Sequence, residues 1–186
     1  MDEGEFMRRI WIALACAGVA AQPAHGELQQ GQITFRCNAA PGHFSMMEVV
    51  QAPDQQELSG FLQAETMYGN AKWAPSAQVR IADIDSGSWV GVRLLTTVQK
   101  KRVITKDASM RLSFASKDQD RPSSDHIVGP VELGKRLAFK IVVRDEDIVL
   151  EIAGIQHSMK LKLGARRKIE LICSTGNFSF IDVLAQ

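Results

Sequence analysis

Hydrophobic and polar residues alternate with a period of two along most of the chain after residue 30. In the clearest run, large apolar residues occupy every second position from Leu137 to Val143. This period places alternate side chains on one face of a pleated strand. Two further alternating runs follow after short turns, at residues 148–152 and 157–163. The three runs together predict a meander of strands.

The rest of the chain shows the same pattern in short segments. Further strands are predicted at residues 32–37, 44–50, 78–84, 89–98, 110–115, 168–173 and 178–184. About ten short strands, separated by Gly, Pro, Ser and Asp and with no long amphipathic helix, predict an antiparallel β-sandwich. Residues 54–63 are expected to form a short helical or irregular excursion, and the polar residues 116–125 are expected to form a loop.

The N-terminus has the layout of a signal peptide. Basic residues at positions 8 and 9 precede an apolar run at residues 10–21, which is shorter than the roughly 20 residues that a membrane-spanning helix needs. We therefore expect export to the periplasm or secretion, with cleavage before Glu27 or before Gln22. The preferred division is a signal peptide at residues 1–26 and one domain at residues 27–186. The acidic residues 1–6 oppose a positive leader, so Met7 is an alternative start.

The chain contains three cysteines, of which Cys16 lies within the predicted signal peptide. Cys16 could instead be an acylation site, although the residues before it match that motif poorly. Cys37 and Cys173 remain in the mature chain, and an oxidising compartment favours a disulfide between them. Two buried free thiols are the alternative.

Composition and charge narrow the class of partner. The chain has 186 residues, 45% of them hydrophobic, and a formal net charge of +1. This is typical of a single globular domain, and it gives no electrostatic reason to expect a nucleic-acid partner. Two basic clusters at residues 100–102 and 166–168 could attract an anionic polysaccharide or a surface, but charge is also normal at predicted turns.

Several segments resemble a known fold family. Residues 134–156 combine an alternating strand, an acidic turn, a second alternating strand and a Gly turn, and residues 178–183 resemble a closing strand. The segments 73–81 and 89–94 fit the same strand sequence. In this pattern the chain resembles the concanavalin A-like and laminin G-like jelly rolls over most of residues 30–185. The resemblance implies carbohydrate binding, polysaccharide cleavage or protein adhesion, commonly on one concave sheet face.

The catalytic motifs of that family do not match. Laminarinase-like glycoside hydrolases of this fold carry Glu-x-Asp-x-x-Glu on one strand, whereas here Glu146 and Glu151 are five residues apart and would lie on opposite faces. Lyases of this fold use Gln-x-His, whereas Gln156 and His157 are adjacent. We therefore expect a non-catalytic module and predict no catalytic residue.

Sugar binding depends on exposed aromatic rings, which stack on the apolar faces of sugars. The mature chain offers Tyr68, Trp73 and Trp89 as candidate ligand-binding residues. Trp89 starts a predicted strand and is therefore also a candidate for the core. We expect a glycan or polysaccharide ligand, and the alternative is a protein-interaction or structural component of the cell envelope that acts through a sandwich face or an edge strand.

Metal and cofactor signals are weak. The four histidines have no spacing typical of a zinc site, so no metal ligand is predicted. Calcium is possible, as in laminin G-like modules, and solvated turns are the simpler explanation of the available acidic residues. These residues are Asp83, Asp85, Asp118 and Asp120.

Overall fold

The computed structural model describes residues 26–27, 32–52, 55–68, 73–96, 110–119 and 121–186, and each regular element within these ranges is a β-strand. The predicted signal peptide up to residue 25, Cys16 and the basic cluster at residues 100–102 lie outside the described residues. The strands are β1 (Gly26–Glu27), β2 (Ile33–Val50), β3 (Glu57–Met67), β4 (Ser76–Asp83), β5 (Trp89–Thr96), β6 (Met110–Lys117), β7 (Ser124–Val131), β8 (Arg136–Arg144), β9 (Asp147–Ile152), β10 (Ile155–Lys160) and β11 (Arg167–Ala185). The prediction of an all-β protein is confirmed.

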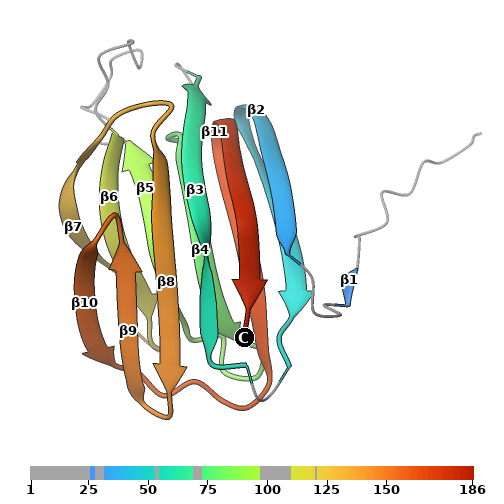
Figure 1. Ribbon diagram of the computed structural model, residues 1–186, viewed down its shortest axis with the longest axis vertical. Helices are drawn as coiled ribbons and strands as arrows, with labels where there is room; N and C mark the ends of the chain where they lie inside the picture. Colours follow the sequence, from blue (N-terminus) through green and yellow to red (C-terminus); the bar gives the residue numbers. More distant parts are fainter. Residues whose placement is uncertain (1–25, 28–31, 53–54, 69–72, 97–109, 120) are drawn as a thin grey trace, which may run out of the picture.

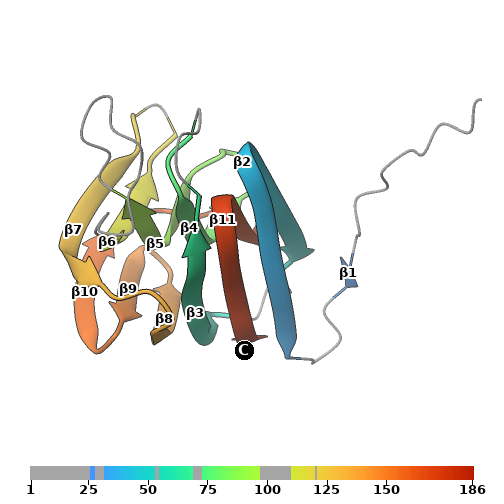
Figure 2. The same ribbon diagram turned by 90° about the horizontal axis from the view of Figure 1, so that it is seen from above.

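The strands form two layers that share the two longest strands, β2 and β11 (Figures 1 and 2). The N-terminal half of β11 pairs with β4 and its C-terminal half pairs with β3, while β2 accompanies β11 along both halves. The first sheet therefore contains β7, β6, β5, β4 and the adjoining halves of β11 and β2. The second sheet contains β10, β9, β8, β3 and the other halves of β11 and β2. All pairs except β1 with β2 are antiparallel, as expected for a sandwich.

β2 and β11 pass from one sheet to the other at a shared irregularity. Their register shifts between Ser174 and Gly176, where residues 40–43 of β2 are left without a Cα partner. Gly42 and Thr175 have positive φ angles of 76° and 52° at this point, and the Gly42 N–H donates to Thr175 Oγ1 at 3.3 Å. Extra residues in one strand of a pair bend it. The sequence therefore predicted two separate strands in each case where the structure has one bent strand.

One predicted element is wrong. Residues 54–63 were expected to be helical or irregular, but β3 covers this segment from residue 57 onward. Leu58 and Leu62 point into the core, and Gly60 occupies the inward position between them, so the alternation lacks an apolar residue there. A Cβ at Gly60 would lie 3.0 Å from the Cα of Val183. The close approach of β11 therefore explains the glycine and the weak pattern.

The predicted loop at residues 116–125 is also shorter than expected, because β6 continues to Lys117 and β7 begins at Ser124. The first four residues of β7 are exposed, and the whole strand contains no buried residue. An edge strand without a buried face shows no period of two, which is why the sequence pattern did not reveal it.

The core lies between the two sheets and is closed by a disulfide. Both sheets contribute buried apolar side chains, including Val79, Val92 and Leu171 from the first sheet and Leu62, Ile141 and Phe178 from the second. The disulfide joins Cys37, on the second-sheet half of β2, to Cys173, on the first-sheet half of β11, with a Cα–Cα distance of 6.2 Å. The predicted pairing is confirmed. The described parts of the chain contain no helix with the length and apolar character needed to cross a bilayer.

Candidate functional site

Polar side chains from neighbouring strands lie together on the outward face of the first sheet. We call this surface the polar face and define it by the residues of β11, β4, β5 and β6, with those of the adjoining half of β2 and of β7, that point away from the core. Cross-strand pairing places Glu170 opposite Arg80, and Gln78 opposite Arg93, which is in turn opposite Ser113. Pairing brings these side chains together although the segments are far apart in sequence.

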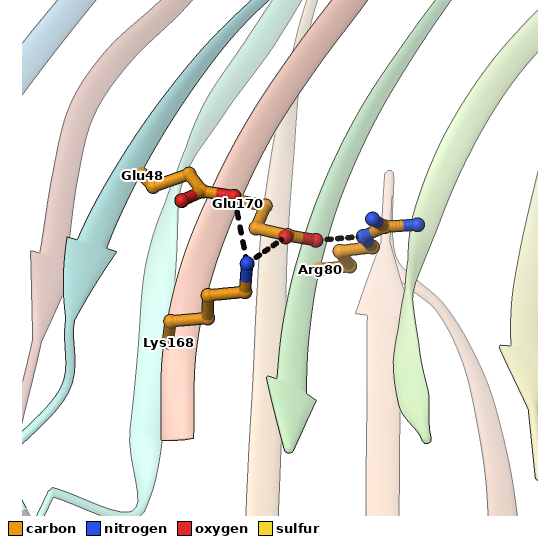
Figure 3. A network of polar contacts seen from close by, with 4 residues as sticks. All are labelled: Glu48, Arg80, Lys168 and Glu170. Atoms are coloured by element: carbon orange, nitrogen blue, oxygen red, sulfur yellow. Dashed lines mark hydrogen bonds and ion pairs between the residues drawn. The ribbon is translucent and has the colours of Figure 1, made fainter. Parts of the chain in front are cut away.

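An ionic network occupies the β2–β11–β4 side of the polar face (Figure 3). Lys168 Nζ donates to Glu48 Oε1 at 2.7 Å and to Glu170 Oε1 at 2.8 Å. Arg80 Nε donates to the other oxygen of Glu170. The Glu170 side chain is only 3% exposed, so both of its oxygens are held by cations rather than by water.

This network determines the ionisation of its members. Burial acts to raise the pKa of Glu170, but the hydrogen bonds and positive charges of Arg80 and Lys168 outweigh it and hold the pKa of Glu170 below its ordinary value. Burial likewise acts to lower the pKa of Lys168, and its bonds to Glu170 and Glu48 outweigh this and raise the pKa above its ordinary value. Both groups are therefore charged at neutral pH.

Glu48 and Glu170 form a pair of neighbouring carboxylates that the sequence did not predict. They are directly opposite each other on β2 and β11 and share Lys168. A glycosidase acid must carry a proton at working pH, which requires a raised pKa. Glu170 has a lowered pKa and no free oxygen, so it does not meet this requirement, and its charge orients Arg80.

A second cluster lies beside the ionic network on β4, β5, β6 and β7. Arg93 Nη1 donates to both oxygens of Asp125, at 3.3 and 3.1 Å, and Ser113 Oγ donates to Asp125 Oδ1 at 3.2 Å. The side-chain amide nitrogen of Gln78 and the Nε of Arg93 are buried and have no hydrogen-bond partner among the described residues. Buried donors are nearly always paired, so these two adjacent donors need an acceptor that the described residues do not supply.

Trp89 is located on the polar face but does not present its ring to solvent. Its exposed fraction is 8%, and it packs with Ala82 and Ala115. The guanidinium of Arg80 covers the ring at 5.0 Å from its centroid, a cation–π contact. In this arrangement Trp89 supports Arg80 instead of offering a stacking platform.

Trp73 lies at the edge of the same face, where it contacts Phe44. The two ring centroids are 5.5 Å apart, and the exposed fractions are 39% for Trp73 and 58% for Phe44. Phe44 is the cross-strand neighbour of Ser174, which also bonds the carbonyl oxygen of Ala74 beside Trp73. The pair forms an exposed aromatic surface at the end of the polar face. Phe44 was not among the ligand-binding residues predicted from the sequence.

Tyr68 is placed apart from the other two candidates. It follows β3 in the second sheet, is half-buried, and its hydroxyl lies 3.1 Å from Oδ1 of Asn177. Its N–H donates to the carbonyl of Thr175, at the point where β11 bends. Tyr68 therefore lies near the sheet crossover, and the structure does not combine Tyr68, Trp73 and Trp89 into one site.

The acidic residues considered for calcium are already engaged. Asp83 accepts hydrogen bonds from the Ser86 hydroxyl at 2.5 Å and from the N–H groups of Asp85 and Gly164, which stabilise a turn. Asp85 pairs with Arg166, and Asp118 pairs with Arg121. Asp120 lies outside the described residues.

Two of the histidines meet at the open edge of the sandwich. His126 of β7 and His157 of β10 stack with ring centroids 4.9 Å apart, and Phe114 stacks against His157. No third ligand joins them: within the described ranges no group of three or more His, Cys, Asp or Glu side chains is placed to hold a metal ion.

Period-two alternation contained part of the signal for the polar face. In the segments around Gln78, Arg93 and Glu170, polar residues occupy the positions between core residues and so must point outward. The pattern does not say which strands are neighbours. It could not show that Glu170 meets Arg80, or that Glu48 joins them, because that depends on the strand order.

Comparison with solved structures identifies the architecture as an antiparallel jelly-roll sandwich. An alginate lyase from Alteromonas sp. 272 superposes with a TM-score of 0.60 and 8% identity, covering 82% of this chain and 86% of that chain. A carbohydrate-binding module from Bacillus subtilis has a TM-score of 0.53 and 7% identity, with 84% and 92% covered. A Bacillus licheniformis β-glucanase has a TM-score of 0.53 and 8% identity, with 83% and 78% covered.

These likenesses establish the fold and nothing narrower, because the identities are so low. No protein-family model and no curated protein sequence matches the chain. The function must therefore be argued from the polar face itself.

Proposed function

We propose that the protein is an exported glycan-binding module that holds its ligand on the polar face. The observation that carries the proposal is the exposed Phe44–Trp73 pair at the edge of a face rich in oriented polar groups. Aromatic rings bind the apolar faces of sugars, and neighbouring donors and acceptors orient the hydroxyl groups. A carbohydrate-binding module is among the solved structures of the same fold, which supports this use of the scaffold.

Two further features support the proposal. The Cys37–Cys173 disulfide is consistent with a protein of an oxidising compartment, where polysaccharides of the cell surface and surroundings are met. The buried, fully paired Glu170 gives the polar face a fixed charge pattern, which suits recognition more than proton transfer.

The test is retention of the purified protein on insoluble polysaccharides and its retardation in gels that contain soluble ones, with and without calcium. Released reducing ends and unsaturated products are measured in the same samples. We expect retention without product. Release of product would show that the protein is an enzyme and not a binding module. The absence of retention on every polysaccharide would contradict the proposal.

Substitution of the aromatic pair locates the site. Phe44→Ala and Trp73→Ala should each weaken retention by about tenfold, because each removes an exposed stacking surface. Leu133→Ala is the matched control, since Leu133 is 44% exposed but precedes β8 outside the polar face. Equal weakening by all three variants would show that the aromatic pair is not the ligand surface.

A protein partner is the second candidate, and the β2 edge favours it. Met46 and Val50 are 42% and 63% exposed and follow Phe44 along the same side of β2. Exposed apolar side chains on an edge strand are a common docking surface. Val50→Lys should abolish binding of such a partner, whereas a glycan held at the Phe44–Trp73 pair should be lost with Trp73→Ala, and this contrast distinguishes the two functions.

A further inference from the structure

We propose that the glycan bound on the polar face is an acidic polysaccharide, and that Arg80, Arg93 and Gln78 together hold one of its anionic groups. The inference rests on the proposed function, because it specifies the ligand class of the same face. It is carried by three hydrogen-bond donors that lie next to one another and that the described residues leave without acceptors.

Arg80 is the first donor and is held firmly in place. Its Nε is bonded to the buried Glu170, and its guanidinium carbon lies over Trp89, 5.0 Å from the ring centroid. Only Nε of Arg80 contacts Glu170 (Figure 3), and the two terminal nitrogens have no hydrogen-bond partner among the described residues. A guanidinium fixed on one side presents its remaining N–H groups in the geometry that suits a carboxylate or a sulfate.

Arg93 and Gln78 supply the other two donors. They are directly opposite each other on β5 and β4, next to the Arg80–Gly91 pair. Asp125 occupies only Nη1 of Arg93, which leaves Nε unpaired, and the side-chain amide nitrogen of Gln78 is unpaired beside it. The Gln78 residue is 7% exposed, whereas the Arg93 side chain is 31% exposed. Because both donor atoms are buried, the proposal requires the Arg93 side chain to turn outward when the anion binds.

The surplus of donors favours an anion over a neutral sugar. A hydroxyl brings its own donor for each acceptor oxygen, whereas a carboxylate or a sulfate ester brings two or three acceptor oxygens and no donor. Three neighbouring N–H donors without acceptors are therefore complementary to an anionic group. Gly91, opposite Arg80, adds no side chain that would compete for the space.

The charges around these donors are compatible with an added anion. Glu48 and Glu170 are neutralised by Lys168 and Arg80, so neither is an unpaired negative charge. Asp125 is likewise paired with Arg93. On β6, Arg111 and Lys117 have no ion-pair partner within the described residues, which leaves the face with an excess of positive charge.

The test compares acidic polymers with neutral counterparts of the same linkage. Binding of the purified protein to polygalacturonate and to alginate is measured beside their carboxyl-reduced forms, and binding to dextran sulfate is measured beside dextran, all at 0.15 M salt, roughly the physiological ionic strength. We expect at least one acidic polymer to bind about tenfold more tightly than its neutral counterpart. A preference only for dextran sulfate would identify the anionic group as a sulfate ester, and a preference for a polyuronate would identify it as a carboxylate.

Two failures are distinguishable. Binding of neutral polymers as tight as, or tighter than, that of their acidic forms would overturn the inference and leave the proposed function standing. No binding to these polymers or to any polysaccharide of the retention assay would overturn both.

Variants test two of the three donors, Arg93 and Gln78. Arg93→Gln should weaken binding of the preferred acidic polymer by about tenfold or more, and Gln78→Met by about fivefold, because each removes one donor. Gln78→Met replaces a buried unpaired amide with an apolar group of similar size, so its thermal unfolding temperature should not fall. Arg144→Gln is the matched charge control, since Arg144 is exposed on β8 in the second sheet.

If Arg144→Gln weakened binding of the acidic polymer as much as Arg93→Gln, the preference would be only nonspecific charge attraction, and the assignment would be overturned. Unchanged binding by both Arg93→Gln and Gln78→Met would do the same.

Discussion

Replacing Glu170 by Gln tests whether the ionic network of the polar face stabilises the fold. Glutamine keeps the size of the side chain and one acceptor oxygen, but it removes the negative charge that lies between Arg80 and Lys168. Both cations would then lose their buried partner, and Lys168 would keep only Glu48.

The expected loss of unfolding free energy follows from burial. Removing one partner of a fully buried ion pair typically costs about 3–5 kcal/mol. Here the Glu170 side chain is 3% exposed, but those of Arg80 and Lys168 are 23% and 28% exposed. Water recovers part of the loss at both cations, so we expect about 2–3 kcal/mol at pH 7.

The loss must also depend on pH, with a definite sign. The folded-state pKa of Glu170 is lowered below its ordinary value, so the charged form is favoured in the folded protein. Its stabilising contribution is complete above the unfolded-state pKa of about 4.3 and disappears as the pH falls through the folded-state pKa. The difference between wild type and Glu170→Gln should therefore be constant from about pH 8 to 5 and shrink below about pH 4.

Urea unfolding followed by tryptophan fluorescence measures both effects. Glu48→Gln is the matched control, because Glu48 is 38% exposed and makes one ion pair, which should be worth less than about 1 kcal/mol. A loss for Glu170→Gln no larger than that of Glu48→Gln would refute the reasoning. A difference between wild type and Glu170→Gln that persists unchanged at acid pH would also refute it, because the cause would then be packing rather than charge.

Two further predictions concern the scaffold. Joint replacement of Cys37 and Cys173 by Ala should lower the unfolding free energy by about 2–5 kcal/mol in urea titrations. The reason is that the disulfide closes a long loop, with a sequence separation of 136. A loss below about 1 kcal/mol would contradict this role. Gly91→Ala should cost about 2–4 kcal/mol by the same measurement, since a Cβ there would lie 2.1 Å from the carbonyl oxygen of Val79. Gly129→Ala, where a Cβ meets nothing within 4 Å, is its control, and similar losses for both would show that the close approach is not the cause.

The sequence predicted the secondary structure well where local rules decide it. A run such as the one from Leu137 to Val143 can bury every second side chain only as a strand, and β8 confirms it. The pairing of Cys37 with Cys173 was equally accessible, because only two cysteines lie in the predicted mature chain. The same alternation contains the outward direction of Gln78, Arg93 and Glu170, because each stands between two core positions.

The sequence pattern did not predict the elements whose shape depends on contacts between distant segments. Gly60 lacks a side chain because β11 approaches it closely, so β3 did not look like a strand. The bend at Thr175 turns what looked like two strands into one, because β2 and β11 serve both sheets.

The candidate site shows the same division most clearly. That the chain would form alternating strands with an apolar face and a polar face was determined by the sequence, because side-chain direction in a strand depends only on the local backbone. Which polar residues meet was decided by the tertiary structure alone. Glu48, Arg80 and Glu170 become neighbours only because β2, β11 and β4 lie side by side, and that order results from hydrogen bonding and core packing between segments far apart in the chain.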